Sequence, residues 1–138
     1  RARAEALYGS WLCGTVLGAV GMSLHHKLCH TLGGGFNLPH AETHAVVLPH
    51  AVAYNAQAAA AELRPLADLF GGDLATGLHA LARSLGAPLA LKDLGLREEQ
   101  LDLAAEQASH RPYPNPRPIE RQAIRALLQR AWEGASPA

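Results

Sequence analysis

Cysteine and net charge are both scarce in this sequence, and each shortage disfavours a class of protein. Only two cysteines, Cys13 and Cys29, occur in 138 residues, and they form no C-x-x-C pair. A disulfide scaffold is therefore not expected, and reduced thiols in a cytoplasmic protein fit the pattern better. Twelve basic and twelve acidic residues give a formal net charge of zero. We expect no nucleic-acid partner, because the sequence offers no basic surface to bind phosphates.

Aromatic residues and runs of β-branched residues are also few, which disfavours a β-sheet. Aromatics make up 5% of the chain, while much of the 49% apolar fraction is alanine and leucine. This composition favours helix, so a single all-helical domain, a bundle over residues 1–138, is predicted. No strand precedes a glycine-rich phosphate loop, since Gly33–Gly35 follow a helical pattern. A nucleotide-binding domain is thus absent from this chain, which starts as if inside a helix and is expected to be part of a longer protein.

The spacing of apolar residues predicts the helices of this bundle. Helices are expected over residues 2–32, 39–53, 56–70, 74–85, 97–109 and 119–133, with a short turn of helix within 89–96. The proline-rich stretch 110–118 is predicted to be an ordered loop, and 134–138 a tail. The glycine run 33–35 is expected to end the first helix. Three stripes are predicted to face the core: Leu63, Leu66, Leu69 and Phe70; Leu74, Leu78, Leu81 and Leu85; and Ile124, Leu127, Leu128 and Ala131.

The first predicted helix has no charged residue between Ala6 and Leu24. Its length would suit a membrane span, and Gly14 and Gly18 have the spacing of small residues found between membrane helices. Glycine and hydroxyl residues dilute its hydrophobicity, however, and the run leads directly into His25. We therefore expect a helix that is buried in the bundle and packed closely through its glycines, with no membrane association.

Histidine is the residue that this sequence has in excess. Six of the eight histidines lie within 35 residues: His25, His26, His30, His40, His44 and His50. His26 and His30 are one helical turn apart, and His40 and His44 repeat that spacing after the glycines. Imidazole is the commonest protein ligand for metals. We infer that His26, His30 and His40 converge on one metal ion or one substrate.

The same stretch resembles the signature of a known enzyme family. The residues H-H-K-L-C-H-T-L-G-G-G-F-N-L-P-H-A-E-T-H, followed by L-P-H-A-V-A-Y-N, resemble the helical domain of iron-containing (group III) alcohol dehydrogenases. The particular residues of this motif are most similar to those of the maleylacetate reductase branch. The residues N-P-R-P at 115–118 resemble that branch as well. The resemblance implies a dehydroquinate synthase-like C-terminal domain that closes a cleft against an N-terminal nucleotide-binding domain. It implies hydride transfer from NADH or NADPH to a small dicarboxylate, maleylacetate, which becomes 3-oxoadipate in the degradation of aromatic compounds.

The resemblance also assigns catalytic and metal-binding roles. His26 and His40 correspond to metal ligands, for iron or zinc, and His30 lies beside the reacting centre. We expect His30 or His26 to deliver the proton, because imidazole has a pKa near neutrality. The family's other two ligands, an Asp and a His on an earlier helix, have no counterpart here. The residues that bind the nicotinamide cofactor are expected in the absent domain, so the isolated chain is expected to be inactive.

Neighbouring residues are candidates for binding the substrate. His25 and His44 distinguish the reductase branch from ordinary alcohol dehydrogenases, and with Lys27 they are candidates to hold the carboxylates. Cys29 is expected to pack in the core rather than act as a nucleophile.

Two alternatives stay open. One is a metal-dependent alcohol dehydrogenase, in which iron or zinc polarises a carbonyl. The other is a helical metal-binding or assembly module with no catalysis of its own. In each case a homodimer is compatible with the sequence.

Overall fold

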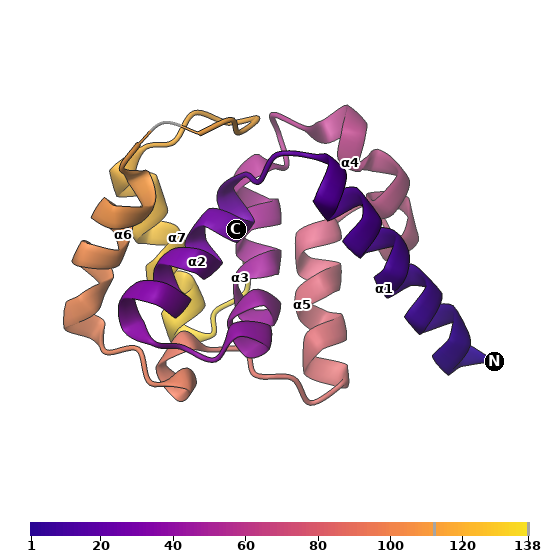
Figure 1. Cartoon of the computed structure of the whole chain (residues 1–138), viewed down its shortest axis with the longest axis horizontal. Helices are drawn as coiled ribbons and strands as arrows, with labels where there is room; N and C mark the ends of the chain where they lie inside the picture. Colours follow the sequence, from indigo (N-terminus) through magenta and orange to yellow (C-terminus); the bar gives the residue numbers. More distant parts are fainter. Residues whose placement is uncertain (112, 138) are drawn as a thin grey trace.

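The computed structural model describes residues 1–111 and 113–137, and these residues contain helices and no strand. The fold class predicted from the composition, all-helical, is therefore confirmed (Figure 1). In chain order the helices are α1 (Ala2–Ala19), α2 (Leu24–Phe36), α3 (His40–Asn55), α4 (Ala60–Ala67), η1 (Asp68–Phe70), α5 (Leu74–Ser84), η2 (Leu91–Leu94), η3 (Glu98–Gln100), α6 (Leu101–Ser109) and α7 (Arg121–Glu133). Residue 112, in the predicted proline-rich loop, and residue 138, in the predicted tail, lie outside the described residues.

Helices α2, α3, α6 and α7 enclose one hydrophobic core (Figure 1). The predicted stripe of the last helix is confirmed, since all four of its residues are buried. Alanines on the inner face of α6 let that helix approach α2 and α7 closely. Burial of each large side chain contributes about 1.5–3 kcal/mol, so this core holds α2 and α3 in place. The largest fully buried side chains include Leu24, Leu28 and Leu32 of α2, Leu101 of α6, and Ile124 and Leu128 of α7.

The break between α2 and α3 lies later than predicted. The glycine run does not end the helix, because Gly33–Gly35 form the last turn of α2. The helix ends instead at Asn37, which takes the left-handed conformation with a φ of 56° and donates its N–H to the Gly33 carbonyl. Asparagine tolerates this conformation better than other side chains. At Gly35, an added Cβ would lie 3.0 Å from Gln107 Oε1, so the glycine allows α6 to approach.

The described residues 113–118 of the proline-rich connection are held by hydrogen bonds, as expected of an ordered loop, and they link the end of α3 to the start of α2. The amides of Asn55 and Asn115 exchange hydrogen bonds of 3.1 and 2.7 Å. The Ser23 hydroxyl, at the start of α2, lies 2.7 Å from Asn115 Oδ1. Tyr54 donates its hydroxyl to the Pro118 carbonyl at 2.6 Å, and the Arg117 guanidinium lies 4.2 Å from the centre of the Tyr54 ring. Arg117 thus helps to hold the loop by stacking on an aromatic ring.

The prediction that the first helix is buried is wrong. No residue of α1 is buried, and an added Cβ at Gly14 or Gly18 would meet no atom within 4 Å. In Figure 1 the helix leaves the body of the bundle at its N-terminal end. Its large apolar side chains are each at least 42% exposed: Leu7, Tyr8, Trp11, Leu12, Val16, Leu17 and Val20. The apolar composition of α1 misled this prediction, because the other described residues do not cover the helix.

Two of the predicted leucine stripes are also only partly buried. Leu66 and Leu69, near α4 and η1, and Leu81 and Leu85, near α5, are all largely exposed, with Leu69 reaching 75%. Leu74 begins α5 and is buried as expected. Apolar side chains on α1, α4 and α5 are therefore left uncovered by the other described residues.

No single helix among residues 1–111 and 113–137 has the length and apolar composition to cross a membrane. Helices α1 and α2 meet these requirements only when counted together, and they are bent by 92° at the break between them.

A pair of buried histidines joins α3 to α5. His50 is 3% exposed and His79 5% exposed, and their rings lie 6.4 Å apart. Neither Nε2 atom has a hydrogen-bond partner. Burial lowers the pKa of His50 to about 4, and the positive charges of His79 and Arg130 add to this effect. Both rings are therefore expected to be neutral at pH 7, and protonating them would place charge in the protein interior.

We expect the stability of the chain to fall as the pH decreases from about 6.5 to about 4. In this range the His50 imidazole binds a proton in the unfolded chain, where its pKa is about 6.5, but not in the folded chain, where it is about 4. Proton uptake therefore favours the unfolded state as pH falls. Urea unfolding at pH 7 and pH 5 measures the change. His50→Gln should reduce the pH dependence, whereas His110→Gln at an exposed histidine should not; equal dependence in both variants would contradict this account.

Candidate active site

Five imidazoles from two helices meet at the N-terminal end of α3. His25, His26 and His30 come from α2, and His40 and His44 come from α3. The turn at Asn37–Pro39 folds α3 back against α2, so the two pairs with helical spacing face each other. Neighbouring ring centres lie 4.2 Å apart for His40 and His44, 5.3 Å for His26 and His44, and 6.4 Å for His30 and His40. The structure thus brings together the three histidines, His26, His30 and His40, that the sequence predicts to converge.

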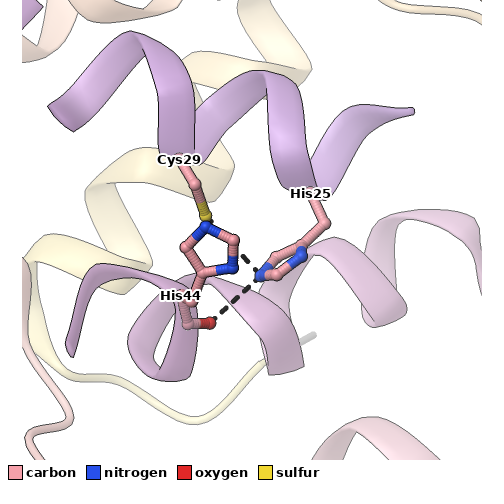
Figure 2. Close-up of side chains that lie close together, drawn as sticks. All are labelled: His25, Cys29 and His44. Carbon is pink, nitrogen blue, oxygen red and sulfur yellow. Dashed lines mark hydrogen bonds between the residues drawn. The ribbon is translucent and has the colours of Figure 1, made fainter. Parts of the chain in front are cut away.

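His25 and His44 form the deep side of this cluster, with Cys29 beside them (Figure 2). The Nε2 of His25 lies 3.1 Å from the carbonyl oxygen of His44 and 3.6 Å from the Cys29 sulfur. Nε2 must carry the hydrogen of the first contact, because a carbonyl oxygen only accepts. The Nε2 of His44 is buried without a hydrogen-bond partner.

The two deep imidazoles are uncharged near neutral pH. Burial lowers the pKa of His44 to about 4, and the neighbouring histidines His25, His40, His26 and His30 lower it further. Burial also lowers the pKa of His25, although its contact with the His44 carbonyl opposes this shift. An anion placed among these rings would raise both pKa values, because it favours the protonated form. Binding of an anion beside His25 and His44 would therefore favour proton uptake by these two rings.

The outer imidazoles are open to a ligand. His30 and His40 are exposed and His26 is half-buried. An apolar hollow of about 460 Å³, lined by His26 and by residues of α1 and the following turn, adjoins the cluster. A ligand bound at His26 would therefore have polar rings on one side and apolar side chains on the other.

Lys27 does not join the cluster. Its ammonium group lies 5.9 Å from the centre of the Tyr113 ring, and the side chain lines a hollow with Glu106 and Gln107 of α6. Successive helical residues point about 100° apart, so the residue after His26 faces α6 instead. The structure separates this candidate substrate contact from the other two, His25 and His44.

The imidazoles are suitable donors for iron or zinc. His26 and His40 both adjoin the His44 ring, at 5.3 and 4.2 Å between centres, so they lie around one space. Two imidazoles make an incomplete shell for a tightly bound ion. His26 and His40 therefore fit a metal site only in part.

Cys29 lies beside the histidine cluster, although the sequence analysis gave it no role in the site. The expectation that it packs in the core is confirmed, because its side chain is fully buried. Burial raises the pKa of its thiol to about 12, so it is not a thiolate nucleophile. Its contact with His25 was nevertheless foreseeable, since the two residues have the same i, i+4 spacing as His26 and His30.

The comparison with known families decides what kind of domain carries this site. The model of the C-terminal domain of the Fe-containing alcohol dehydrogenase family matches residues 1–132. The chain belongs to this family. The resemblance drawn from the histidine motif is confirmed, and so is the implied fold.

Individual relatives agree with this assignment. Maleylacetate reductases from a Rhizobium species and from Burkholderia cepacia are 64% and 57% identical to this chain over 137 residues. The crystal structures of maleylacetate reductases from Rhizobium and Agrobacterium tumefaciens match 99% of the chain with TM-scores of 0.95 and 0.96. An iron-containing alcohol dehydrogenase from Corynebacterium glutamicum is 45% identical, with a TM-score of 0.73 over 81% of the chain. This family domain spans 39% of the length of the reductases it matches.

Proposed function

We propose that this chain is the C-terminal part of an NADH- or NADPH-dependent oxidoreductase that reduces maleylacetate to 3-oxoadipate. The cluster of five imidazoles carries the proposal, because it places exposed rings that a substrate can reach beside half-buried rings whose pKa values lie below that of a free histidine. The similarity to enzymes named maleylacetate reductase supports the choice of substrate. A cytoplasmic location, which fits two free cysteines, is part of the proposal.

The residues of this chain bind the substrate and move its proton. His25 and His44 receive the carboxylates of maleylacetate, and their pKa values rise as the dianion enters. A nicotinamide cofactor, when bound, would supply the hydride that one carbon of the double bond receives. His30, with His26 as the second candidate, delivers a proton to the adjacent carbon, so that 3-oxoadipate leaves with two more hydrogen atoms than maleylacetate. Positively charged imidazoles beside the substrate stabilise the negative charge that develops during this step.

A metal-dependent alcohol dehydrogenase is the second candidate. The incomplete pair of metal donors, His26 and His40, favours it. In that enzyme the two imidazoles would hold iron or zinc, which acts as a Lewis acid on a substrate oxygen.

The exposed apolar side chains indicate where the rest of the protein sits. We propose that the N-terminal nucleotide-binding part, which this chain does not contain, covers α1 and the hollow beside His26. Leu12, Val16 and Val20 would then form one wall of a closed cleft around the substrate. A homodimer would use the remaining exposed leucines of α4 and α5, and the solution mass of the complete protein tests it.

Chelation of the complete protein distinguishes the two candidates. We expect turnover of maleylacetate with NADH or NADPH to be unchanged by a chelator. The isolated 138-residue chain serves as the control and should give no turnover, because the nicotinamide site is outside it. Activity that disappears on chelation and returns with Fe²⁺ or Zn²⁺ would instead support the metal-dependent dehydrogenase.

A further inference from the structure

A second group of metal donors lies beside the pair that the family resemblance assigns to iron or zinc. His25, Cys29 and His44 each offer one donor atom, and these atoms all lie within 4.8 Å of one another. Figure 2 shows the three side chains converging between α2 and α3. From these observations we propose that His25, Cys29 and His44 form a binding site for a thiophilic ion of the Zn²⁺ class, separate from the His26 and His40 pair.

The helices present these donors as known metal sites do. His25 and Cys29 are four residues apart on α2, so their side chains project from one face on successive turns. His44 reaches the same space from α3, which packs directly on α2. The packing that fixes these helices therefore also fixes the three donors, and no loop has to reorganise.

The distances suit a tetrahedral ion. Bonds of about 2.0–2.3 Å to nitrogen and sulfur place two ligand atoms about 3.3–3.8 Å apart in tetrahedral geometry. The His25 Nε2 and Cys29 sulfur atoms are already 3.6 Å apart. The His44 ring has to move only slightly from the position shown, since every donor pair lies within 4.8 Å.

The unpartnered nitrogen of His44 gives independent support. Its Nε2 is buried and has no hydrogen-bond partner in the structure. A buried polar atom without a partner destabilises the fold, so such atoms often mark a ligand site. A metal ion would satisfy this nitrogen and the thiol together.

The donor set determines which ions bind. One thiolate and two imidazoles favour zinc and other thiophilic ions over magnesium, calcium or manganese, which prefer oxygen. Binding replaces the thiol hydrogen of Cys29 by a sulfur–metal bond and releases one proton to solvent. The hydrogen on His25 Nε2, which now faces the His44 carbonyl, moves to Nδ1 so that Nε2 can coordinate.

Cobalt(II) in place of zinc tests the proposal on the complete protein after chelation. A cobalt–thiolate bond gives a charge-transfer absorption in the near ultraviolet, which cobalt bound only to histidine lacks. We expect this absorption in the unsubstituted protein, its displacement by Zn²⁺, and its loss in Cys29→Ser. Cys13→Ser is the matched control, because Cys13 is the exposed cysteine and should leave the absorption unchanged. Absorption that is missing from the unsubstituted protein, or that survives in Cys29→Ser, would overturn the proposal.

Two histidine variants keep the test decisive if Cys29→Ser does not fold. His44→Gln changes a side chain that is only half-buried and should abolish the absorption while Cys29 remains; retention would refute the site. His40→Ala removes a donor of the neighbouring pair and should leave the absorption in place, whereas loss would show that a single shared site exists. The readout does not use turnover. An ion at His25 and His44 would keep both rings unprotonated and would itself hold the carboxylates that the proposed function assigns to these rings, so failure of one proposal does not imply failure of the other.

Discussion

Replacing His30 with alanine in the complete protein should lower the turnover number for maleylacetate by about 10²–10⁴-fold, the usual contribution of a positioned general acid. His30 is exposed at the open side of the cluster, with its ring 6.3 Å from His26 and 6.4 Å from His40. Substrate can therefore reach it, while the deeper rings contact carboxylates. Steady-state kinetics with NADH or NADPH measures the effect, and the pH profile should lose the limb that reports this acid.

The matched control is His110→Ala. His110 is also an exposed histidine, but it lies at the end of α6 and contributes to a different hollow. Its removal should leave the turnover number unchanged. Circular dichroism should show the same helix content in both variants, because neither side chain is buried. If His30→Ala retained full turnover while His26→Ala lost it, the proton donor would be His26 instead.

Replacing Leu32 with alanine should lower the free energy of unfolding by about 2–5 kcal/mol, the range for a leucine removed from a tightly packed core. Leu32 is 0% exposed and belongs to the helix that carries His25, His26 and His30. The lost side chain leaves a cavity against the inner face of the core. Loosened packing of α2 should also reduce turnover in the complete protein, since a proton donor displaced by an ångström works much less well.

Urea unfolding of the 138-residue chain measures the stability effect, provided that the slope with denaturant is unchanged. Leu103→Ala on α6 is the matched control, because that leucine is 50% exposed. It should change the free energy of unfolding by less than about 1 kcal/mol, since little packing is lost. Similar losses in the two variants would mean that the core is not organised around α2 as the structure indicates.

Much of the fold and of the site could be predicted from local patterns. All four side chains of the apolar stripe on α7 are buried because the two helices that pack against it, α3 and α6, are present in this chain. His26 and His30 have helical spacing, and such spacing fixes which side chains share a face without reference to the rest of the fold. Six histidines around a turn, in a recognisable order, were enough to indicate the family.

Predictions failed in two situations. In one, burial of a helix depended on a surface outside that helix; in the other, two neighbouring sequence signals could each have ended the helix. The leucines of α4 and α5 and the whole of α1 have the composition of buried helices, yet composition does not say what covers them. The glycine run was expected to end a helix, but Asn37 two residues later offered a better left-handed terminus. Glycines in a last helical turn cost only about 1 kcal/mol each relative to alanine, which the packing of α2 against α3 and α6 offsets.

The sequence by itself determined the helical class, the family and the group of histidines, because each depends on residue type and on spacing along a single helix. Only the tertiary structure decided that Lys27 turns toward α6, that His44 meets His25 and Cys29, and that α1 is not covered by the other described residues. These outcomes depend on how two helices are rotated against each other and on which surfaces are present to bury them. Rotation and burial are properties of the packed core, and spacing along one helix carries no information about them.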